Sequence, residues 1–186
     1  MSVLDTAKYV LHHAGEMTAM KLEKLVYYCQ AWSLAWDGVL LFDEDFQAWA
    51  NGPACPELYE THRGRFWLGE DFYDSYGPHS FTQAQEETMN AVLEGYADKE
   101  PQWLSELTHL ERPWRETRCG VKPGEPCNWL MRGAWEAVCE YIFELRTEFL
   151  QDIKPHSVRP MIQTMRERGA FLRNSRLRRF PHPLTC

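Results

Sequence analysis

The sequence predicts a mainly α-helical, compact domain built around one central aromatic-rich helix, with one short extended or hairpin element. Three observations predict this fold class. Residues 18–38 carry apolar side chains at helical spacing, and several other stretches repeat the same 3.6-residue period. Alternation with a period of two is confined to residues 46–50.

The first helix is expected to begin at the capping box formed by residues 2–5, SVLD, and to end at Gly15. Its apolar stripe consists of Leu4, Ala7, Leu11 and Ala14.

The central helix is expected over residues 18–38, TAMKLEKLVYYCQAWSLAWDG. Thr18 can cap its start through the side-chain hydroxyl, and Asp37-Gly38 supplies a turn that ends it. Tyr27 and Tyr28 widen the apolar side, so we expect neighbours on two sides of this helix. The stripe consists of Leu22, Leu25, Val26, Cys29, Trp32, Ser33 and Trp36.

An extended segment is expected next, because Phe46, Ala48 and Ala50 alternate with Gln47 and Trp49. Residues 51–53, Asn-Gly-Pro, are expected to break this segment. A short helix is then expected over residues 56–66, since a proline at its first position loses no hydrogen bond. A Gly- and Asp-rich connection follows near residues 69–80.

Three more helices are expected after this connection. A capping box at residues 82–85 begins the first, and Pro101 begins the second, which ends before Pro113. A loop rich in Gly and Pro at residues 119–126 separates them from a long helix over residues 126–151. The apolar positions are Met89, Val92, Leu93 and Tyr96, then Leu104, Leu107 and Thr108, then Leu130, Ala134, Ala137, Val138, Tyr141, Ile142, Leu145 and Phe149.

Composition places the 186-residue chain among globular proteins, with 44% hydrophobic and 25% charged residues. We expect no membrane span and no secretory signal, because the apolar runs are only a few residues long and the first residues lack the pattern of a leader. The six cysteines show no short paired spacing, so we expect reduced thiols in a cytoplasmic protein.

The formal net charge of −7 is unevenly distributed. Residues 151–186 hold 8 basic and 2 acidic side chains, a net charge of +6, whereas residues 1–150 hold 12 basic and 25 acidic ones, a net charge of −13. We therefore expect a domain over residues 1–150 and a basic C-terminal extension over residues 151–186. An acidic domain repels phosphates, so nucleic acid is not an expected partner of the domain.

The basic extension allows several interpretations. Ser157 can cap a helix from Val158 that places an apolar face among arginines. Such a segment can dock on the acidic domain, grip an acidic partner, contact nucleic acid or an anionic membrane, or remain solvated. We favour a protein contact, with Met161, Ile162, Met165, Arg166, Arg168 and Arg173 as candidate partner-binding residues.

No pattern in the sequence points to an enzyme, a metal site or a cofactor. The motifs of serine hydrolases, zinc proteases and phosphate-binding loops are absent from the sequence. Thr108-His109 is the strongest reactive candidate, but we favour a structural role in which it holds a neighbouring loop and the turn at residues 113–114. His109, Cys119 and Cys127 lack the paired spacing of zinc ligands. We therefore expect no metal, no cofactor and no small-molecule substrate.

Trp49 and Tyr59 flank the Gly52-Pro53 turn and are candidate partner-binding residues. Aromatic side chains supply a large contact area at low entropic cost. The alternative is that both rings only support the turn, while Pro53 and Pro56 fix the exit of the chain.

Three stretches carry a family pattern: KLEKLVYYCQAW, FQAWANGPACPELYE and WLSELTHLERPWRETR. They are similar to the KLxKLxYxxQ, GPxxPxxY and LSxLTHxxxPWxxAR stretches of one family, in the same order. The chain thus resembles the Panacea domain of the SocA-like antitoxin family, found in bacteria and phages. Ala54 and Cys55, in place of an aliphatic residue, and Thr117, in place of a small apolar one, depart from the pattern. The matching residues are Lys21, Leu22, Lys24, Leu25, Tyr27, Gln30, Gly52, Pro53, Pro56, Tyr59, Leu107, Thr108, His109, Pro113, Trp114 and Arg118.

The resemblance covers about residues 1–150 and implies a mostly α-helical antitoxin that is not an enzyme. Such a protein neutralises a cognate protein toxin by direct contact, in the manner of a type II toxin–antitoxin system. Two alternatives stay open: an adaptor that delivers a bound protein to a cytoplasmic protease, and a regulator that contacts DNA through the basic extension. The identity of the toxin, assembly into a homo-oligomer and a bacterial or phage origin are also left open.

Overall fold

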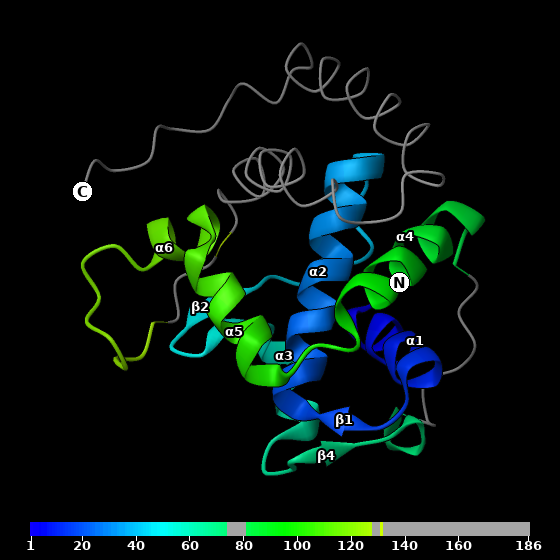
Figure 1. The fold of residues 1–186 in the computed structure, drawn as a ribbon, viewed down its shortest axis with the longest axis horizontal. Coiled ribbons are helices and arrows are strands. Elements are labelled where there is room, and N and C mark those ends of the chain that lie inside the picture. Colours follow the sequence, from blue (N-terminus) through cyan, green and yellow to red (C-terminus); the bar gives the residue numbers. More distant parts are fainter. Residues whose placement is uncertain (74–80, 128–130, 132–186) are drawn as a thin grey trace.

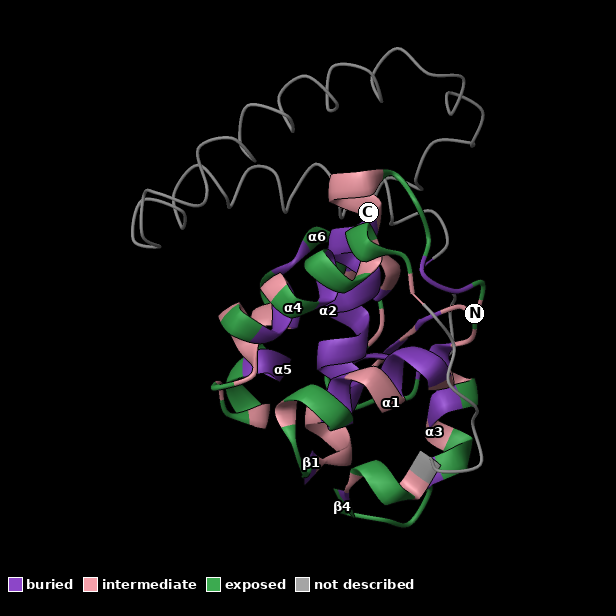
Figure 2. Ribbon diagram, turned by 90° about the vertical axis from the view of Figure 1, so that its right-hand side faces the viewer, coloured by how far each residue is buried: buried purple, intermediate pink, exposed green. Residues whose placement is uncertain are grey.

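Helix α2 (Ala19–Asp37) runs through the middle of the molecule, and the other elements are arranged around it (Figure 1). The computed structural model describes residues 1–73, 81–127 and 131. All residues of α2 from Leu22 to Ser33 are buried, as Figure 2 shows. The predicted fold class is confirmed: the molecule is mainly helical, with a central aromatic-rich helix.

The capping signals in the sequence are confirmed at four helix ends. The Thr18 hydroxyl accepts a hydrogen bond from the backbone of α2, and Gly38 ends the helix in the left-handed conformation. Reciprocal capping boxes form at residues 2–5 and at residues 82–85. These ends depend on contacts within one helical turn, which is why the sequence predicts them well.

Helices α1 (Val3–Ala14) and α4 (Gln83–Tyr96) pack on one side of α2 through apolar side chains. The predicted stripe of α1 needs a correction: Leu4 and Ala14 are only half-buried, because they lie at the edge of the packed face. The buried apolar residues of these two helices are Val3, Ala7, Val10 and Leu11, then Met89, Val92 and Leu93.

The predicted extended segment forms one strand of an antiparallel hairpin, β2 (Gln47–Trp49) and β3 (Gly52–Ala54). A two-residue turn joins the strands, and the register pairs Ala48 with Pro53. The prediction that residues 51–53 only break the strand is wrong, because Gly52 and Pro53 belong to the returning strand. A proline is tolerated there because both strands of a two-stranded sheet are edges.

A second two-stranded sheet pairs β1 (Met17–Thr18) with β4 (Trp67–Leu68), and the sequence analysis does not predict it. Helix α3 (Pro56–His62) ends before the predicted residue 66, because the chain turns at Gly64 to enter β4. The predicted connection contains the 3-10 helix η1 (Glu70–Tyr73).

Helix α5 (Pro101–Leu110) begins and ends as predicted, and the short helix α6 (Arg112–Thr117), which was not predicted, follows it. Of the long helix predicted over residues 126–151, three residues lie within the described part of the chain: Pro126, Cys127 and Met131. None of the three is in a helix, so the prediction is wrong at these positions, and Cys127 and Met131 are buried. The basic extension, with its candidate residues, lies outside the described residues. No helix in the described part of the chain is long and apolar enough to cross a membrane.

The cysteines differ in state. Cys29, Cys55 and Cys127 are buried free thiols, whereas Cys119 is disulfide-bonded. The prediction of reduced thiols is therefore wrong for Cys119, because spacing along the chain does not reveal pairing between distant cysteines.

Candidate functional site

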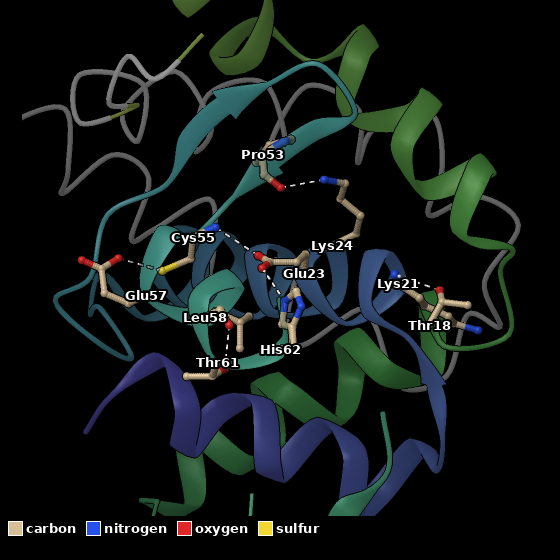
Figure 3. Close-up of polar contacts among 10 residues, drawn as sticks. All are labelled: Thr18, Lys21, Glu23, Lys24, Pro53, Cys55, Glu57, Leu58, Thr61 and His62. Carbon is tan, nitrogen blue, oxygen red and sulfur yellow. Dashed lines mark hydrogen bonds and ion pairs between the residues drawn. The ribbon is translucent and has the colours of Figure 1, made fainter. Parts of the chain in front are cut away.

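Two consecutive charged residues of α2, Glu23 and Lys24, contact the hairpin and α3 (Figure 3). The Lys24 ammonium donates a hydrogen bond of 2.6 Å to the Pro53 carbonyl in β3. The Lys24 side chain is only 2% exposed. Burial lowers the pKa of Lys24 to about 8, although the neighbouring carboxylate of Glu23 acts in the opposite direction.

Glu23 contacts both ends of α3, and it points about 100° away from Lys24 because the two residues are successive in a helix. Its Oε2 accepts a hydrogen bond of 3.0 Å from the Cys55 amide before the helix, and its Oε1 lies 2.9 Å from the Nε2 of His62 in the last turn. Glu23 and His62 are both buried. The sequence does not reveal the contact between Glu23 and His62, because the two residues lie 39 positions apart.

Helix α5 lies directly against the hairpin at Gly52. This glycine has a φ of +99°, and a Cβ there would overlap the Thr108 hydroxyl and lie 2.9 Å from Cε of Lys24. The Thr108 hydroxyl donates to the Ser105 carbonyl, and the Ser105 hydroxyl in turn donates to the Asn51 carbonyl over 2.9 Å. The bond from α5 to the hairpin turn is thus made by Ser105, while Thr108 supplies the close contact.

His109 of α5 and Trp114 of α6 contact each other and the hairpin strand β2. Their rings stack with centroids 4.1 Å apart, and the indole N–H of Trp114 donates to the Trp49 carbonyl over 2.8 Å. The pKa of His109 is lowered by burial and then by the positive charge of Lys24, with a smaller opposing effect from a hydrogen bond with the Ala50 backbone. A neutral imidazole next to Lys24 is consistent with the structural role favoured for His109.

Glu111 joins α5 and α6 to the central helix. Its two carboxylate oxygens accept hydrogen bonds from the hydroxyls of Tyr27, at 3.1 Å, and Tyr28, at 2.8 Å. Burial raises the pKa of Glu111 to about 7, and the two hydroxyls oppose this rise. Glu111 was not among the predicted site residues, although its place inside the third family stretch was a signal.

Arg118 ties the other strand of the hairpin to the loop that follows α6. Its guanidinium donates to the Ala48 carbonyl over 2.8 Å and to the carbonyls of Lys122 and Glu125. The same guanidinium lies 5.2 Å from the ring centre of Trp114. Both hairpin strands are therefore fastened by a buried cation, Lys24 for β3 and Arg118 for β2.

The remaining family residues support the same region or the core. Gln30 donates to the Phe42 carbonyl and accepts from the Leu41 amide, which fixes the chain before the hairpin. Leu22, Leu25 and Pro113 are buried, and Lys21 and Leu107 are half-buried.

The two predicted partner-binding aromatics of the domain lie side by side. The rings of Trp49 on β2 and Tyr59 on α3 meet edge to face, with centroids 4.7 Å apart, and both side chains are half-buried. The Trp49 indole donates to the Gln47 side chain. We call the hairpin (residues 47–54) together with α3 the hairpin face.

Within the described residues, no group of three or more His, Cys, Asp or Glu side chains could hold a metal ion. The buried charges around the hairpin are engaged with backbone carbonyls, amides and tyrosine hydroxyls. These contacts hold the hairpin and α3 against α2, α5 and the end of α6.

The family model for the SocA-like antitoxin, Panacea domain, matches residues 22–115, which is 94 of the 186 residues. The matched region begins in α2 and ends in α6, so it contains the hairpin face and the contacts of Lys24, Glu23 and Glu111. No curated protein and no solved structure matches the chain. Because the family model covers half of the chain, the protein belongs to the SocA-like antitoxin family with a Panacea domain.

Proposed function

We propose that this protein neutralises a cognate protein toxin by direct binding and that the hairpin face is the contact surface. The observation that carries the proposal is the convergence of three separated family stretches on one hairpin. Lys24 comes from the first stretch, Gly52 and Pro53 from the second, and Thr108 and Trp114 from the third.

The type of contact supports a binding role. A buried ammonium or carboxylate costs stability, and well-packed apolar side chains often serve a fold equally well or better. The domain nevertheless buries Lys24, Glu23, Glu111 and Arg118 around one short hairpin. We infer that these contacts serve the exact placement of a surface more than the stability of the fold.

The composition of the hairpin face supports the same conclusion. Tryptophan and tyrosine are the residues most enriched among those that dominate binding energy at interfaces. Trp49 and Tyr59 are half-buried and in contact with each other, so little conformational entropy is lost when a partner covers them. The mechanism we propose is occlusion of the toxin's working surface, without catalysis by the antitoxin.

Co-purification with the product of the neighbouring gene tests the proposal. We expect a stable complex with a protein that is toxic when expressed alone. Trp49→Ala should weaken the complex by roughly tenfold to a hundredfold, as is typical of a central interface aromatic. Trp67→Ala is the matched control, since Trp67 is 62% exposed on the other sheet. Equal losses in the two variants, or no complex at all, would contradict the proposal.

The purified protein and its partner also distinguish the proposed antitoxin from the two alternatives, a protease adaptor and a regulator that binds DNA. A protein that only blocks its partner leaves the partner's half-life in cells unshortened, whereas a protease adaptor shortens it. Deletion of residues 151–186 tests the basic extension: loss of the complex would assign it a protein contact, and loss of DNA binding would support the regulator.

A further inference from the structure

We propose that Lys24 is a positioning residue whose buried positive charge sets the place of the β2–β3 hairpin and so presents Trp49 to the partner. The inference deepens the proposed function and rests on it for the identity of the partner. The part that concerns the hairpin itself is testable in the free protein.

The geometry around the ammonium carries the proposal. Lys24 Nζ lies 2.6 Å from the Pro53 carbonyl oxygen, and a Cβ on Gly52 would lie only 3.0 Å from Nζ. The Thr108 hydroxyl lies against the same Cβ position of Gly52. The hairpin thus approaches α2 so closely that only glycine fits at position 52, and the atom of α2 nearest to this point belongs to the charged Lys24 side chain.

Lys24 holds its place through a backbone carbonyl and not through a carboxylate. The adjacent Glu23 is engaged with the Cys55 amide and with His62. Among the described residues, no salt bridge to Lys24 is formed. A buried lysine without an ion-pair partner is costly, so a role in fold stability alone explains it poorly.

A contact at Pro53 reaches Trp49 through the register of the hairpin. Pro53 pairs with Ala48, and Gly52 pairs with Trp49. A shift of β3 away from α2 would therefore carry Trp49 with it and strain the hydrogen bond between the Trp49 carbonyl and Trp114.

The charge of Lys24 can be removed by pH as well as by mutation. Since burial lowers its pKa to about 8, the ammonium loses its proton within a range that the protein can be studied in. The titratable groups that interact electrostatically with it are Glu23 on α2 and His109 on α5, and His109 in turn feels the charge of Arg118. Between pH 7.5 and 9.5 His109 is neutral, because its pKa is lowered from 6.5, and the guanidinium of Arg118 keeps its charge. Glu111, with a pKa of about 7, completes its titration at the lower end of this range, and this contribution is common to the wild type and to Lys24→Met.

The first experiment needs no partner. The ¹³C chemical shift of the Pro53 carbonyl, observed by carbon detection, is followed between pH 7.5 and 9.5 in the full-length chain. We expect a titration with a midpoint near pH 8 in the wild type and in Lys21→Met, a half-buried lysine of the same helix. The step should be absent from Lys24→Met. A Pro53 signal that does not titrate in the wild type, even when the range is extended past the ordinary lysine pKa of about 10.4, would overturn the proposal, even if Lys24→Met failed to fold.

The second experiment compares stability with binding. Lys24→Met removes the cost of a buried charge but leaves the Pro53 carbonyl without a donor, so we expect the thermal midpoint to change little. Affinity for the neighbouring gene product should fall by roughly tenfold or more, the loss expected for a charged hydrogen bond. Lys24→Met that binds like Lys21→Met would overturn the positioning role. If the wild type itself binds no partner, the proposed function fails, while the Pro53 titration still decides the role of Lys24 in the hairpin.

Discussion

The two sides of α2 are built on different principles. On one side, α1 and α4 pack mainly through apolar side chains, with Tyr96 of α4 stacked on Tyr28. On the other side, the hairpin, α5 and α6 are held by buried lysine, glutamate and arginine (Figure 1). Apolar packing is not directional and tolerates small shifts, whereas a charged hydrogen bond fixes the positions of its two atoms. We propose that the polar side, besides its share in stability, fixes the shape of the hairpin face, whereas the apolar side contributes to stability alone.

This difference explains why the domain accepts costly buried charges next to a core that could have been apolar. A surface that fits a partner must keep its shape in the free protein, because any ordering on binding reduces affinity. The following predictions test the division between the two sides, beginning with the largest expected effect.

Gly52→Ala should cause the largest loss of stability. The new Cβ would overlap the Thr108 hydroxyl, and φ of +99° is unfavourable for any other residue. We expect a loss of about 3–5 kcal/mol in the free energy of unfolding, from steric overlap and backbone strain together. Gly64→Ala is the matched control, with a φ of +82° and no atom within 4 Å of the new Cβ. Urea unfolding of both variants measures the difference, and similar losses would show that the close contact with α5 is unimportant.

Met89→Ala should lower stability without moving the hairpin. Met89 is fully buried in α4 on the apolar side, and its truncation should cost about 2–4 kcal/mol. Partner affinity, measured at a temperature where the variant is folded, should stay within about twofold of the wild type because the lost contacts are remote from the hairpin. A large loss of affinity would show that the two sides of α2 are not independent.

Glu111 should make stability depend on pH. Its pKa is raised from 4.5 to about 7 in the folded protein, so the folded state binds this proton more tightly than the unfolded state does. The stability that the proton contributes is complete below pH 4.5 and is lost as pH rises to 7, with a total of about 3 kcal/mol.

Glu111→Gln provides the comparison for this prediction, since an amide cannot titrate and can still bond the two tyrosine hydroxyls. We expect the wild type to lose stability relative to Glu111→Gln between pH 4.5 and 7.5, measured by urea unfolding at each pH. Parallel pH profiles for the two proteins would refute the raised pKa. Lys24 is protonated in both states over most of this range, and its partial deprotonation near pH 7.5 is common to the two proteins.

The sequence predicts the apolar side of the molecule better than the polar side. Helix caps such as Thr18 and the stripes of α2 and α4 depend on neighbours three or four residues apart, and a period in the sequence reveals them. The contact of Glu111 with Tyr28 joins residues 83 apart, and the β1–β4 sheet pairs residues about 50 apart. No local pattern encodes such contacts. The family resemblance singled out Lys24, Gly52 and Trp114 without indicating that they meet at one hairpin.

Trp114→Phe should have the smallest effect on stability, and it tests the hydrogen bond that joins α6 to strand β2 of the hairpin. The phenyl ring can still stack on His109, but it cannot donate to the Trp49 carbonyl, which now accepts at 2.8 Å. Because water can reach this half-buried site, we expect a loss of only about 1 kcal/mol in stability. Trp103→Phe, at a tryptophan of α5 that is 37% exposed, controls for the change of ring size. If the hairpin face is the binding surface, Trp114→Phe should weaken partner binding by more than its effect on stability explains, since the lost bond acts directly on the backbone of Trp49. An effect on stability without one on binding would mean that Lys24 and Arg118 are sufficient to place the hairpin.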